Sequence, residues 1–318
     1  MTFTSNNITA LTSVLFVSFL PGCSPTKRAY EPISVRSAKG HRIHYPASNR
    51  RPYIKSIQTK TQEGTWLIDS GATESVIHLN KNSPLKYTRS DYPIRNYNLY
   101  GMFKSKTVSL SGFRVSSLNL PDITGLILPE KRFYKANNAN GILGLSFLRE
   151  NKSILYMPSK FLGWGNTTPH TKKFQAIKLS VRPGSGHLLL NCKINKQPLC
   201  FIIDTGASRS LIDYRSAKRA ALSLKHTNKK ISGIWGRPSK ASKTAITSIH
   251  INSEQNIPPL TERFFVTDLS QIIGDLTSSG IAEPVDGIIG YEILSSNFHA
   301  IDFGRNLLLY EPSKKLSE

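Results

Sequence analysis

The sequence is poor in cysteine, in acidic residues and in long hydrophobic runs. Three cysteines in 318 residues exclude a small fold held together by many disulfide bridges. Only 20 acidic residues face 42 lysines and arginines, so the formal net charge is +22. Long runs of Ala, Glu and Leu are missing, which excludes a coiled coil, and a hydrophobic content of 39% excludes a disordered polar chain. Frequent Ile, Val, Thr, Ser and Tyr then indicate a basic, globular, β-rich protein.

One apolar run, at the N-terminus, approaches membrane length. Residues 8–20 form a 13-residue segment, too short to cross a bilayer comfortably, so a protein with several membrane spans is excluded. Leu20-Pro21-Gly22-Cys23 follows at once and resembles the lipobox of bacterial lipoproteins, in which a small residue precedes the lipidated cysteine. The resemblance implies a signal peptide at residues 1–22 and a lipid on Cys23. A buried N-terminal segment is the alternative.

The stretch after Cys23 is basic and has no periodic apolar pattern. Glu31 is its single acid, which predicts a solvated tether at residues 23–52. Acyl chains on Cys23 would hold the protein on a membrane surface without a transmembrane helix. We therefore expect a lipoprotein of the cell envelope, facing the periplasm or the exterior. Its positive charge would favour anionic envelope surfaces.

An internal repeat organises the rest of the chain. Leu67–Ala72 (LIDSGA) is echoed by Ile202–Ala207 (IIDTGA), 135 residues later. Gly141–Gly144 (GILG) is echoed by Gly287–Gly290 (GIIG), 146 residues later. Two copies of one unit therefore make up the body of the protein. The predicted parts are an N-terminal lobe at 53–164, a linker at 165–184, a C-terminal lobe at 185–312 and a tail at 313–318.

Each copy is predicted to be rich in strands. A first strand is followed by a polar turn and an apolar strand that ends at an aspartate, either Asp69 or Asp204. A short helical segment and one closing strand are expected after each Gly-Ile-Leu/Ile-Gly element. The expected first strands are 53–57 and 187–192, the helical segments are 146–151 and 292–297, and the closing strands end at Trp164 and Tyr310.

The two Asp-Ser/Thr-Gly-Ala loops carry the candidate chemistry. An apolar strand fixes each carboxylate, and glycine lets the backbone turn where a side chain would clash. A pseudo-twofold axis between the copies would bring Asp69 and Asp204 together, and two close carboxylates share one proton. The ionised member can then activate a water while the protonated member polarises a peptide carbonyl. The pattern predicts peptide hydrolysis without a covalent intermediate.

These residues resemble the signature of the retropepsin-like aspartic proteases, with Ile142-Leu143-Gly144 and Ile288-Ile289-Gly290 matching the family's hydrophobic-hydrophobic-Gly element. The resemblance implies an all-β fold of two pseudo-symmetric β-barrel lobes with a cleft between them. It implies an aspartic endopeptidase that acts on peptide or protein substrates and needs no metal or organic cofactor. Because one chain holds both lobes, we expect a monomer. The implied dyad is Asp69 and Asp204, supported by Ser70, Gly71, Thr205 and Gly206.

The resemblance also implies positions that bind substrate. The residues that follow the two loops are Thr73 and Glu74 in the first lobe and Ser208 and Arg209 in the second. We hypothesise that Glu74 and Arg209 give the two sides of the cleft opposite charge preferences; the alternative is that both are solvated at the rim. Hairpin flaps are expected at 99–103 and 233–237, with Tyr100, Gly101 and Trp235 as contact residues.

Cys192 and Cys200 flank a predicted turn at 195–197, so they are expected to lie near each other on a hairpin. Outside the cytoplasm this position favours a disulfide, and two buried thiols are the alternative.

Two other classes of function remain open at this point. The same fold can serve as a non-catalytic peptide-binding module, because fold alone does not establish activity. The net charge of +22 also suits a polyanion or nucleic-acid binder. No aromatic-basic RNA-binding motif or zinc finger accompanies that charge, which argues against nucleic acid.

Overall fold

The protein is described here from a computed structural model in which strands predominate. The described residues are 12–13, 40–42, 51–59, 62–77, 87–98, 101–110, 114–115, 118–119, 123–127, 139, 141–164, 174–181, 186–227, 230–232, 238–240, 243–252, 257–269 and 285–312.

The N-terminal lobe is built on a ten-stranded sheet. Its strands, in spatial order, are β1 (Thr12–Ser13), β6 (Tyr87–Asn98), β7 (Gly101–Leu110), β10 (Ile123–Ile127), β5 (Ser75–Ile77), β11 (Gly141–Leu143), β4 (Gln62–Ile68), β3 (Tyr53–Thr59), β8 (Arg114–Val115) and β9 (Leu118–Asn119). Strand β11 lies between β4 and β5, parallel to β4 and antiparallel to β5. The strands on either side of the first Asp loop are therefore held apart by the strand that contains the Gly-Ile-Leu element.

The C-terminal lobe repeats this order. Its strands are β15 (Ser180–Val181), β16 (Leu188–Ile194), β17 (Gln197–Ile203), β24 (Gly287–Ile289), β18 (Leu211–Asp213), β23 (Leu260–Thr267), β22 (Lys243–Ile251) and β19 (Lys225–His226). An additional pairing of β16 with β22 closes six of these strands into a barrel. The order β3-β4-β11-β5-β10-β7 in the first lobe matches β16-β17-β24-β18-β23-β22 in the second, so the repeat in the sequence is a repeat of topology.

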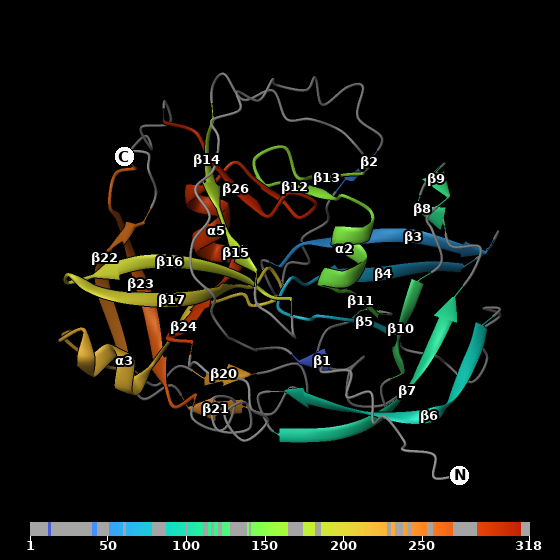
Figure 1. The fold of residues 1–318 in the computed structure, drawn as a ribbon, viewed down its shortest axis with the longest axis horizontal. Helices are drawn as coiled ribbons and strands as arrows, with labels where there is room; N and C mark the ends of the chain where they lie inside the picture. The colour runs from blue at the N-terminus through green and yellow to red at the C-terminus, as the bar shows by residue number, and fades with distance from the viewer. Residues whose placement is uncertain are drawn as a thin grey trace, which may run out of the picture.

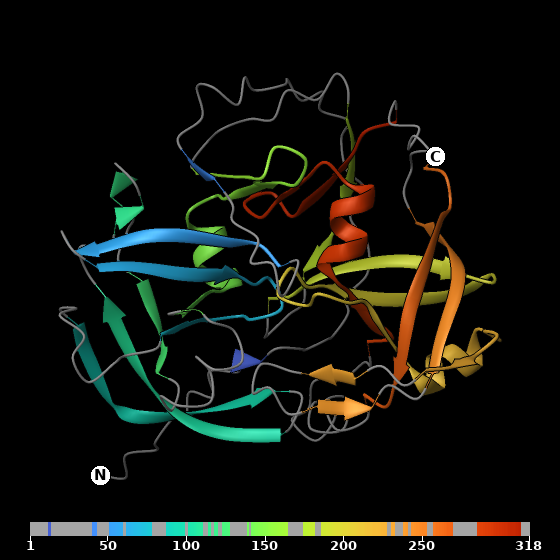
Figure 2. The same ribbon diagram turned by 180° about the vertical axis from the view of Figure 1, so that it is seen from behind.

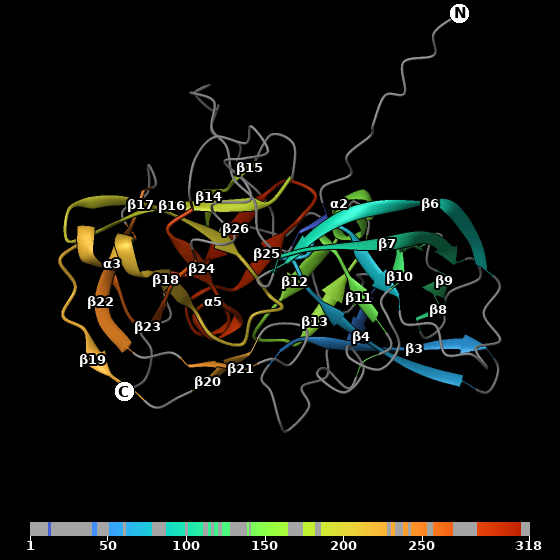
Figure 3. The same cartoon turned by 90° about the horizontal axis from the view of Figure 1, so that it is seen from below.

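A six-stranded sheet joins the lobes (Figure 1). Its strands are β14 (Gln175–Lys178), β26 (Leu307–Tyr310), β25 (Ala300–Asp302), β12 (Ile154–Tyr156), β13 (Phe161–Gly163) and β2 (Gly40–Arg42). The central pair is β12 and β25, one from each copy, with Leu155 opposite Ile301. Both side chains are fully buried, so one hydrophobic core continues from lobe to lobe. Figures 2 and 3 show the same arrangement from behind and from below.

The remaining described elements are short. The helices are α2 (Leu145–Glu150), α3 (Tyr214–Arg219) and α5 (Tyr291–Asn297), and β20 (Lys230–Ser232) pairs with β21 (Pro238–Lys240) in a small hairpin. In Figure 1 this hairpin and the β6–β7 hairpin lie along the bottom of the molecule, opposite the six-stranded sheet. No helix among the described residues is long and apolar enough to cross a membrane.

Bulky side chains explain the glycines that open β11 and β24. Gly141 lies opposite Trp66 of β4, and Gly287 lies opposite Phe201 of β17. A methyl group on Gly141 would lie 2.3 Å from the Trp66 ring, and one on Gly287 would lie 2.7 Å from the Phe201 ring. Both rings are fully buried. Each lobe thus combines a large aromatic residue with a facing glycine, which lets the parallel strands pack closely.

The predicted fold class is confirmed, but some observed strands differ from the predicted ones. The single closing strand expected in each copy is wrong, because two short strands joined by a turn occupy that stretch (β12–β13 and β25–β26). Residues with positive φ, Lys160 at 50° and Asn306 at 57°, lie in these turns. Strands β2 and β14 occupy equivalent outer places in the shared sheet, 135 residues apart, although they lie in the predicted tether and linker.

Candidate active site

Each Asp loop begins where a buried strand ends. Asp69 follows β4, and its backbone N–H donates to the Leu143 carbonyl at 3.1 Å. Asp204 follows β17, and its N–H donates to the Ile289 carbonyl at 3.0 Å. Strands β11 and β24 therefore fix the position at which each aspartate leaves its sheet.

Both carboxylates accept hydrogen bonds from their own turns. Asp69 Oδ1 accepts from the N–H of Gly71 at 2.9 Å and from that of Ala72 at 3.1 Å. Asp204 Oδ1 accepts from the N–H of Gly206 at 2.8 Å and from that of Ala207 at 2.9 Å. One oxygen of each carboxyl group is therefore held in the same way in both lobes.

The two loops bind each other through reciprocal hydroxyl bonds. Ser70 Oγ donates to the Ile203 carbonyl at 2.7 Å and accepts from the Thr205 N–H at 3.0 Å. Thr205 Oγ1 donates to the Ile68 carbonyl at 2.9 Å and accepts from the Ser70 N–H at 3.0 Å. All four bonds are buried. The lobes are thus fixed relative to each other at the base of the two loops.

This arrangement brings the two carboxyl groups together. The side chains of Asp69 and Asp204 are within hydrogen-bonding reach of each other, and they are 5% and 3% exposed. Each packs against the glycine of the opposite loop. A methyl group on Gly71 would lie 2.4 Å from Asp204 Cγ, and one on Gly206 would lie 2.1 Å from Asp69 Cγ. Glycine is required in both loops because a carboxyl group occupies the space that a side chain would need.

Burial and mutual repulsion set the protonation of the pair. Burial raises the pKa of Asp69, while the hydrogen bond with Asp204 and the charge of Arg51 lower it. Burial also raises the pKa of Asp204, and the negative charge of Asp69 raises it further, well above its ordinary value. Two close, buried carboxyl groups titrate as a coupled pair, and the loss of the first proton makes the loss of the second harder.

The Gly-Ile-Leu/Ile-Gly elements hold the Asp loops through hydrogen bonds. The Gly144 N–H donates to Ser75 Oγ at 3.1 Å, and the Gly290 N–H donates to Ser210 Oγ at 2.7 Å. The first residue of each following helix also donates, at 2.7 Å, to the alanine carbonyl of the Asp loop in the same lobe. The loop and the start of the helix therefore form one hydrogen-bonded unit in each lobe.

The residues predicted to bind substrate lie next to these loops. Thr73 is buried, Glu74 and Ser208 are partly exposed, and Arg209 is exposed. Glu74 Oε2 accepts from Ser146 Oγ at 3.0 Å, so this carboxyl is held by its own lobe. Burial raises the pKa of Glu74. In the second lobe, Glu292 occupies the place of Ser146 and accepts from the Ser210 N–H. Burial raises the pKa of Glu292 to about 7, although the Arg209 charge opposes this.

The strands that flank the predicted flap segments pair with each other, β6 with β7 and β20 with β21. Gly101 begins β7 opposite Asn98, the last residue of β6, and the segment 233–237 separates β20 from β21. Tyr100 and Trp235 lie outside the described residues, as does the predicted lipidation site Cys23.

The predicted bridge between Cys192 and Cys200 is wrong. Both cysteines are buried, and neither forms a disulfide. The two-residue turn at Asn195 and Lys196, both with positive φ, pairs Cys192 with Leu199 and leaves Cys200 opposite Asn191. Adjacent residues of a strand point to opposite faces, so the two sulfur atoms lie on opposite sides of the hairpin.

Three polar groups near the loops were missed by the sequence reasoning: Arg51, His187 and Asp286. Arg51 and His187 each lie just before the first strand of a lobe, which is a positional signal, although the 135-residue offset of the Asp loops pairs Arg51 with Gly186 rather than with His187. Asp286 precedes β24 and has no such signal.

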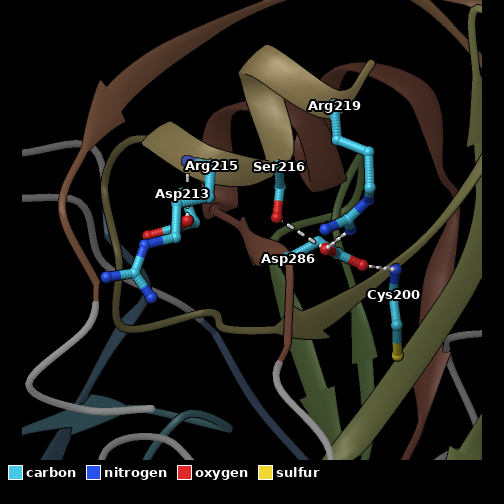
Figure 4. A network of polar contacts seen from close by, with 6 residues as sticks. All are labelled: Cys200, Asp213, Arg215, Ser216, Arg219 and Asp286. Carbon is cyan, nitrogen blue, oxygen red and sulfur yellow. Dashed lines mark hydrogen bonds and ion pairs between the residues drawn. The ribbon is translucent and has the colours of Figure 1, made fainter. Parts of the chain in front are cut away.

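Asp286 ties three segments of the C-terminal lobe together (Figure 4). Its carboxylate accepts from the Cys200 N–H at 2.8 Å and from Ser216 Oγ at 2.6 Å, and it forms an ion pair with Arg219. Its carbonyl accepts from the Asp213 N–H at 2.8 Å. Helix α3 is thereby fixed to the strand that supports Asp204.

Among the described residues, no group of three or more His, Cys, Asp or Glu side chains is arranged to hold a metal ion.

Comparison with known proteins decides the family. A family model described as aspartyl protease matches residues 56–147 and 190–293, one stretch in each lobe and together more than half of the chain. The chain belongs to the aspartyl protease family. Membership confirms the retropepsin-like resemblance, and each matched stretch contains one Asp loop and one Gly-Ile-Leu/Ile-Gly element.

Two solved structures are similar to this chain over most of its length. They are basic 7S globulin from soybean, with a TM-score of 0.47, and conglutin gamma, a basic 7S globulin from lupine seeds, with a TM-score of 0.49. Each is 9% identical in sequence, and each alignment covers 86% of this chain and 94% of the other. No curated protein matches the sequence.

Proposed function

We propose that the protein is an aspartic endopeptidase in which Asp69 and Asp204 share one proton and hydrolyse peptide bonds. The observation that carries this proposal is the packing of each carboxyl group against the glycine of the opposite loop. A structural or degenerate pair would not need both loops to keep Asp, a hydroxyl residue and Gly in the same places. Here both loops keep all three, and each hydroxyl bonds across the lobe boundary.

The chemistry follows from the shared proton. The ionised carboxylate takes a proton from a water molecule as its oxygen attacks the scissile carbonyl carbon. The protonated carboxyl donates its proton toward the carbonyl oxygen, so a tetrahedral diol forms without a covalent bond to the protein. When the C–N bond breaks, one carboxyl group gives a proton to the leaving amine and the other carboxylate takes a proton from a hydroxyl of the diol, which restores the singly protonated pair. Activity is therefore expected between the two ionisations of the pair, with a bell-shaped pH profile.

The test is peptide cleavage by the full chain in mild detergent, from about pH 3 to 8, read by mass spectrometry on a diverse peptide library. Asp69→Asn and Asp204→Asn should each lower cleavage by about a thousandfold or more, because both carboxyl groups transfer protons. Asp302→Asn is a matched control: this carboxyl is also buried but bonds to Arg305 outside the loops.

Loss of cleavage in both dyad variants but not in Asp302→Asn supports the proposal. Full activity in either dyad variant contradicts it. A parent that binds peptides and cleaves none at any pH would favour the peptide-binding module instead. Circular dichroism and thermal unfolding of every variant separate loss of chemistry from loss of folding.

For the sides of the substrate site, we propose that Glu74 favours basic and Arg209 favours acidic substrate residues. Support comes from their equivalent places after the two loops and from their exposure, which is partial for Glu74 and larger for Arg209. Glu74→Gln and Arg209→Gln should each change the charge preference at one subsite in cleavage profiles. Unchanged profiles would mean that both side chains are solvated at the rim.

We further propose that the endopeptidase is held at a bacterial cell envelope through a lipid on Cys23. The proposal rests on the Leu-Pro-Gly-Cys sequence after an apolar segment and on the basic stretch that follows. Metabolic labelling with an alkyne fatty acid in a bacterial host should modify the parent and not Cys23→Ser, and should place only the parent in the membrane fraction. Equal labelling of both proteins would contradict lipidation at Cys23.

A further inference from the structure

Two nitrogen-bearing side chains cross between the lobes beside the dyad. Arg51, two residues before β3, donates through Nη1 to the Gly206 carbonyl at 3.4 Å. His187, one residue before β16, contacts the Gly71 carbonyl through Nε2 at 3.1 Å. A carbonyl oxygen can only accept, so Nε2 of His187 carries the hydrogen. Each lobe thus holds the loop glycine of the other lobe.

These two glycines are the residues against which the carboxyl groups pack. Gly206 adjoins the carboxyl of Asp69, and Gly71 adjoins that of Asp204. Arg51 is therefore tied to the loop that covers Asp69, and His187 to the loop that covers Asp204. A shift of either glycine would move the carboxyl group that rests on it.

Arg51 and His187 occupy similar positions in the two lobes but differ in charge. An arginine stays protonated at every pH of interest, whereas a histidine has a pKa near neutrality in water. Arg51 is half-buried, and its guanidinium also lies over the Tyr53 ring, 5.8 Å from the centroid. His187 is fully buried. The dyad therefore has a permanent positive charge on its Asp69 side.

We propose that Arg51 and His187 are positioning residues for the dyad, and that the Arg51 guanidinium makes Asp69 the carboxylate and leaves Asp204 the protonated acid. The role in catalysis rests on the proposed function, whereas the distribution of the proton does not. Asp69 then takes the proton from water, and Asp204 donates its proton to the substrate carbonyl.

The groups that act on the pair agree with this division. Asp69 faces Asp204, Arg51 and the N–H groups of its own turn, and the Arg51 charge lowers its pKa. Asp204 faces Asp69 and the N–H groups of its own turn, and the negative charge of Asp69 raises its pKa. No cationic side chain is among the groups that lower the pKa of Asp204.

The test compares Arg51→Met, which removes the charge, with Arg51→Lys, which keeps it, in the full chain. Arg263→Met is the control, because Arg263 is exposed on β23 and its loss also lowers the net charge by one. In Arg51→Met, Asp69 should ionise at higher pH, so the acid limb of kcat/KM should move up by roughly one pH unit. Arg51→Lys and Arg263→Met should keep the acid limb of the parent.

His187→Gln and His187→Leu test the other side, because glutamine keeps an N–H donor and leucine does not. We expect kcat to fall roughly tenfold in His187→Leu alone, with the acid limb unmoved in both variants. Equal losses in the two variants, or none, would overturn the positioning role of His187. An acid limb in Arg51→Met that coincides with the parent would overturn the role of Arg51.

A readout that does not need activity separates this inference from the proposed function. Protein labelled with ¹³C at the aspartate carboxyl carbons is titrated by NMR, with Asp69→Asn used to assign the signals. Asp69 should ionise first in the parent, and its midpoint should rise in Arg51→Met whether or not any peptide is cleaved. First ionisation at Asp204 in the parent would overturn the assignment even in an active protease.

Discussion

The two lobes share a backbone plan but differ in the side chains that surround it. Six strands occupy the same order in both, and each Asp carboxylate accepts from the same two N–H groups of its turn. Around this frame, Arg51 is replaced by His187 at the lobe boundary, and Ser146 is replaced by Glu292 at the start of the following helix. The comparison teaches that the backbone around the two Asp loops is symmetric, whereas the charged side chains around them are not.

The largest effect on this symmetric geometry is expected from replacing the glycine of each Asp loop by alanine. Gly71→Ala and Gly206→Ala each place a methyl group within 2.4 Å of the opposite carboxyl carbon, so that carboxyl must move. Cleavage should fall by at least about a hundredfold in both variants. Gly163→Ala is the control, because its methyl would meet its nearest neighbour at 3.5 Å. A large loss in only one loop variant would mean that the loops are not equivalent.

The Asp286 network tests stability on the C-terminal side alone. Asp286→Ala leaves the Cys200 N–H, the Ser216 hydroxyl and the Arg219 guanidinium without this acceptor, and we expect a loss of about 3 kcal/mol in unfolding free energy. Arg219→Ala removes a partner that is 46% exposed and should cost less than about 1 kcal/mol. Urea unfolding measures both. Equal losses would assign the stabilisation to the ion pair rather than to the buried hydrogen bonds.

The hydroxyl bonds across the lobe boundary should be equivalent in energy. Ser70→Ala and Thr205→Ala each remove one buried donor and one buried acceptor, so we expect about 2 kcal/mol of destabilisation in either variant. The double variant should lose less than the sum, because the two hydroxyls share one network. Thr205→Ser keeps the hydroxyl and should cost less than about 1 kcal/mol. An additive double variant would show two independent contacts.

The smallest expected effect concerns Glu292, which has Ser146 at its equivalent place. Its folded pKa, about 7, lies above its ordinary value of 4.5, so the folded state holds this proton more tightly than the unfolded state. That contribution to stability is complete below about pH 4.5 and is lost as pH rises through about 7. Glu292→Gln should therefore show a weaker fall in melting temperature over this window than the parent.

Thermal unfolding between pH 4 and 8 measures this difference. Ser146→Ala, at the equivalent place in the N-terminal lobe, removes the hydrogen bond that lowers the pKa of Glu74, so its melting temperature should fall more steeply with rising pH than that of the parent. Parallel pH profiles of the parent and Glu292→Gln would show that Glu292 titrates outside this window.

The sequence alone predicted the elements whose signal is local. The turn residues of the Asp loops, the apolar strands before them and a turn within 195–197 each follow from short-range chemistry. The structure narrows that turn to Asn195 and Lys196, because Gln197 already belongs to β17. The repeat then predicted a shared topology. The closing hairpins were missed because Leu, Ile and Tyr continue on both sides of their turns, and the outer strands β2 and β14 were missed because their pattern is not apolar. Their hydrogen-bond partners lie far along the chain.

Two features of the site show where sequence reasoning ends. The thiols of Cys192 and Cys200 were expected near each other, but the register of one hairpin places them on opposite faces. Arg51 was counted among the basic residues of a tether, although it donates to the loop that covers Asp69. The position of the two thiols depends on one residue of strand register. The role of Arg51 depends on a contact with Gly206, which lies 155 residues further along the chain.

The sequence by itself determined that one chain contains two matched Asp loops. Each loop has a glycine two residues after its aspartate and follows an apolar strand. The tertiary structure decided which groups surround each carboxyl. Only folding brings Gly206 against Asp69, Gly71 against Asp204, and a permanent positive charge to one side of the pair. The physical reason is that a repeat fixes the backbone by local preference, whereas the ionisation of a buried carboxyl depends on every charge and dipole that folding brings near it.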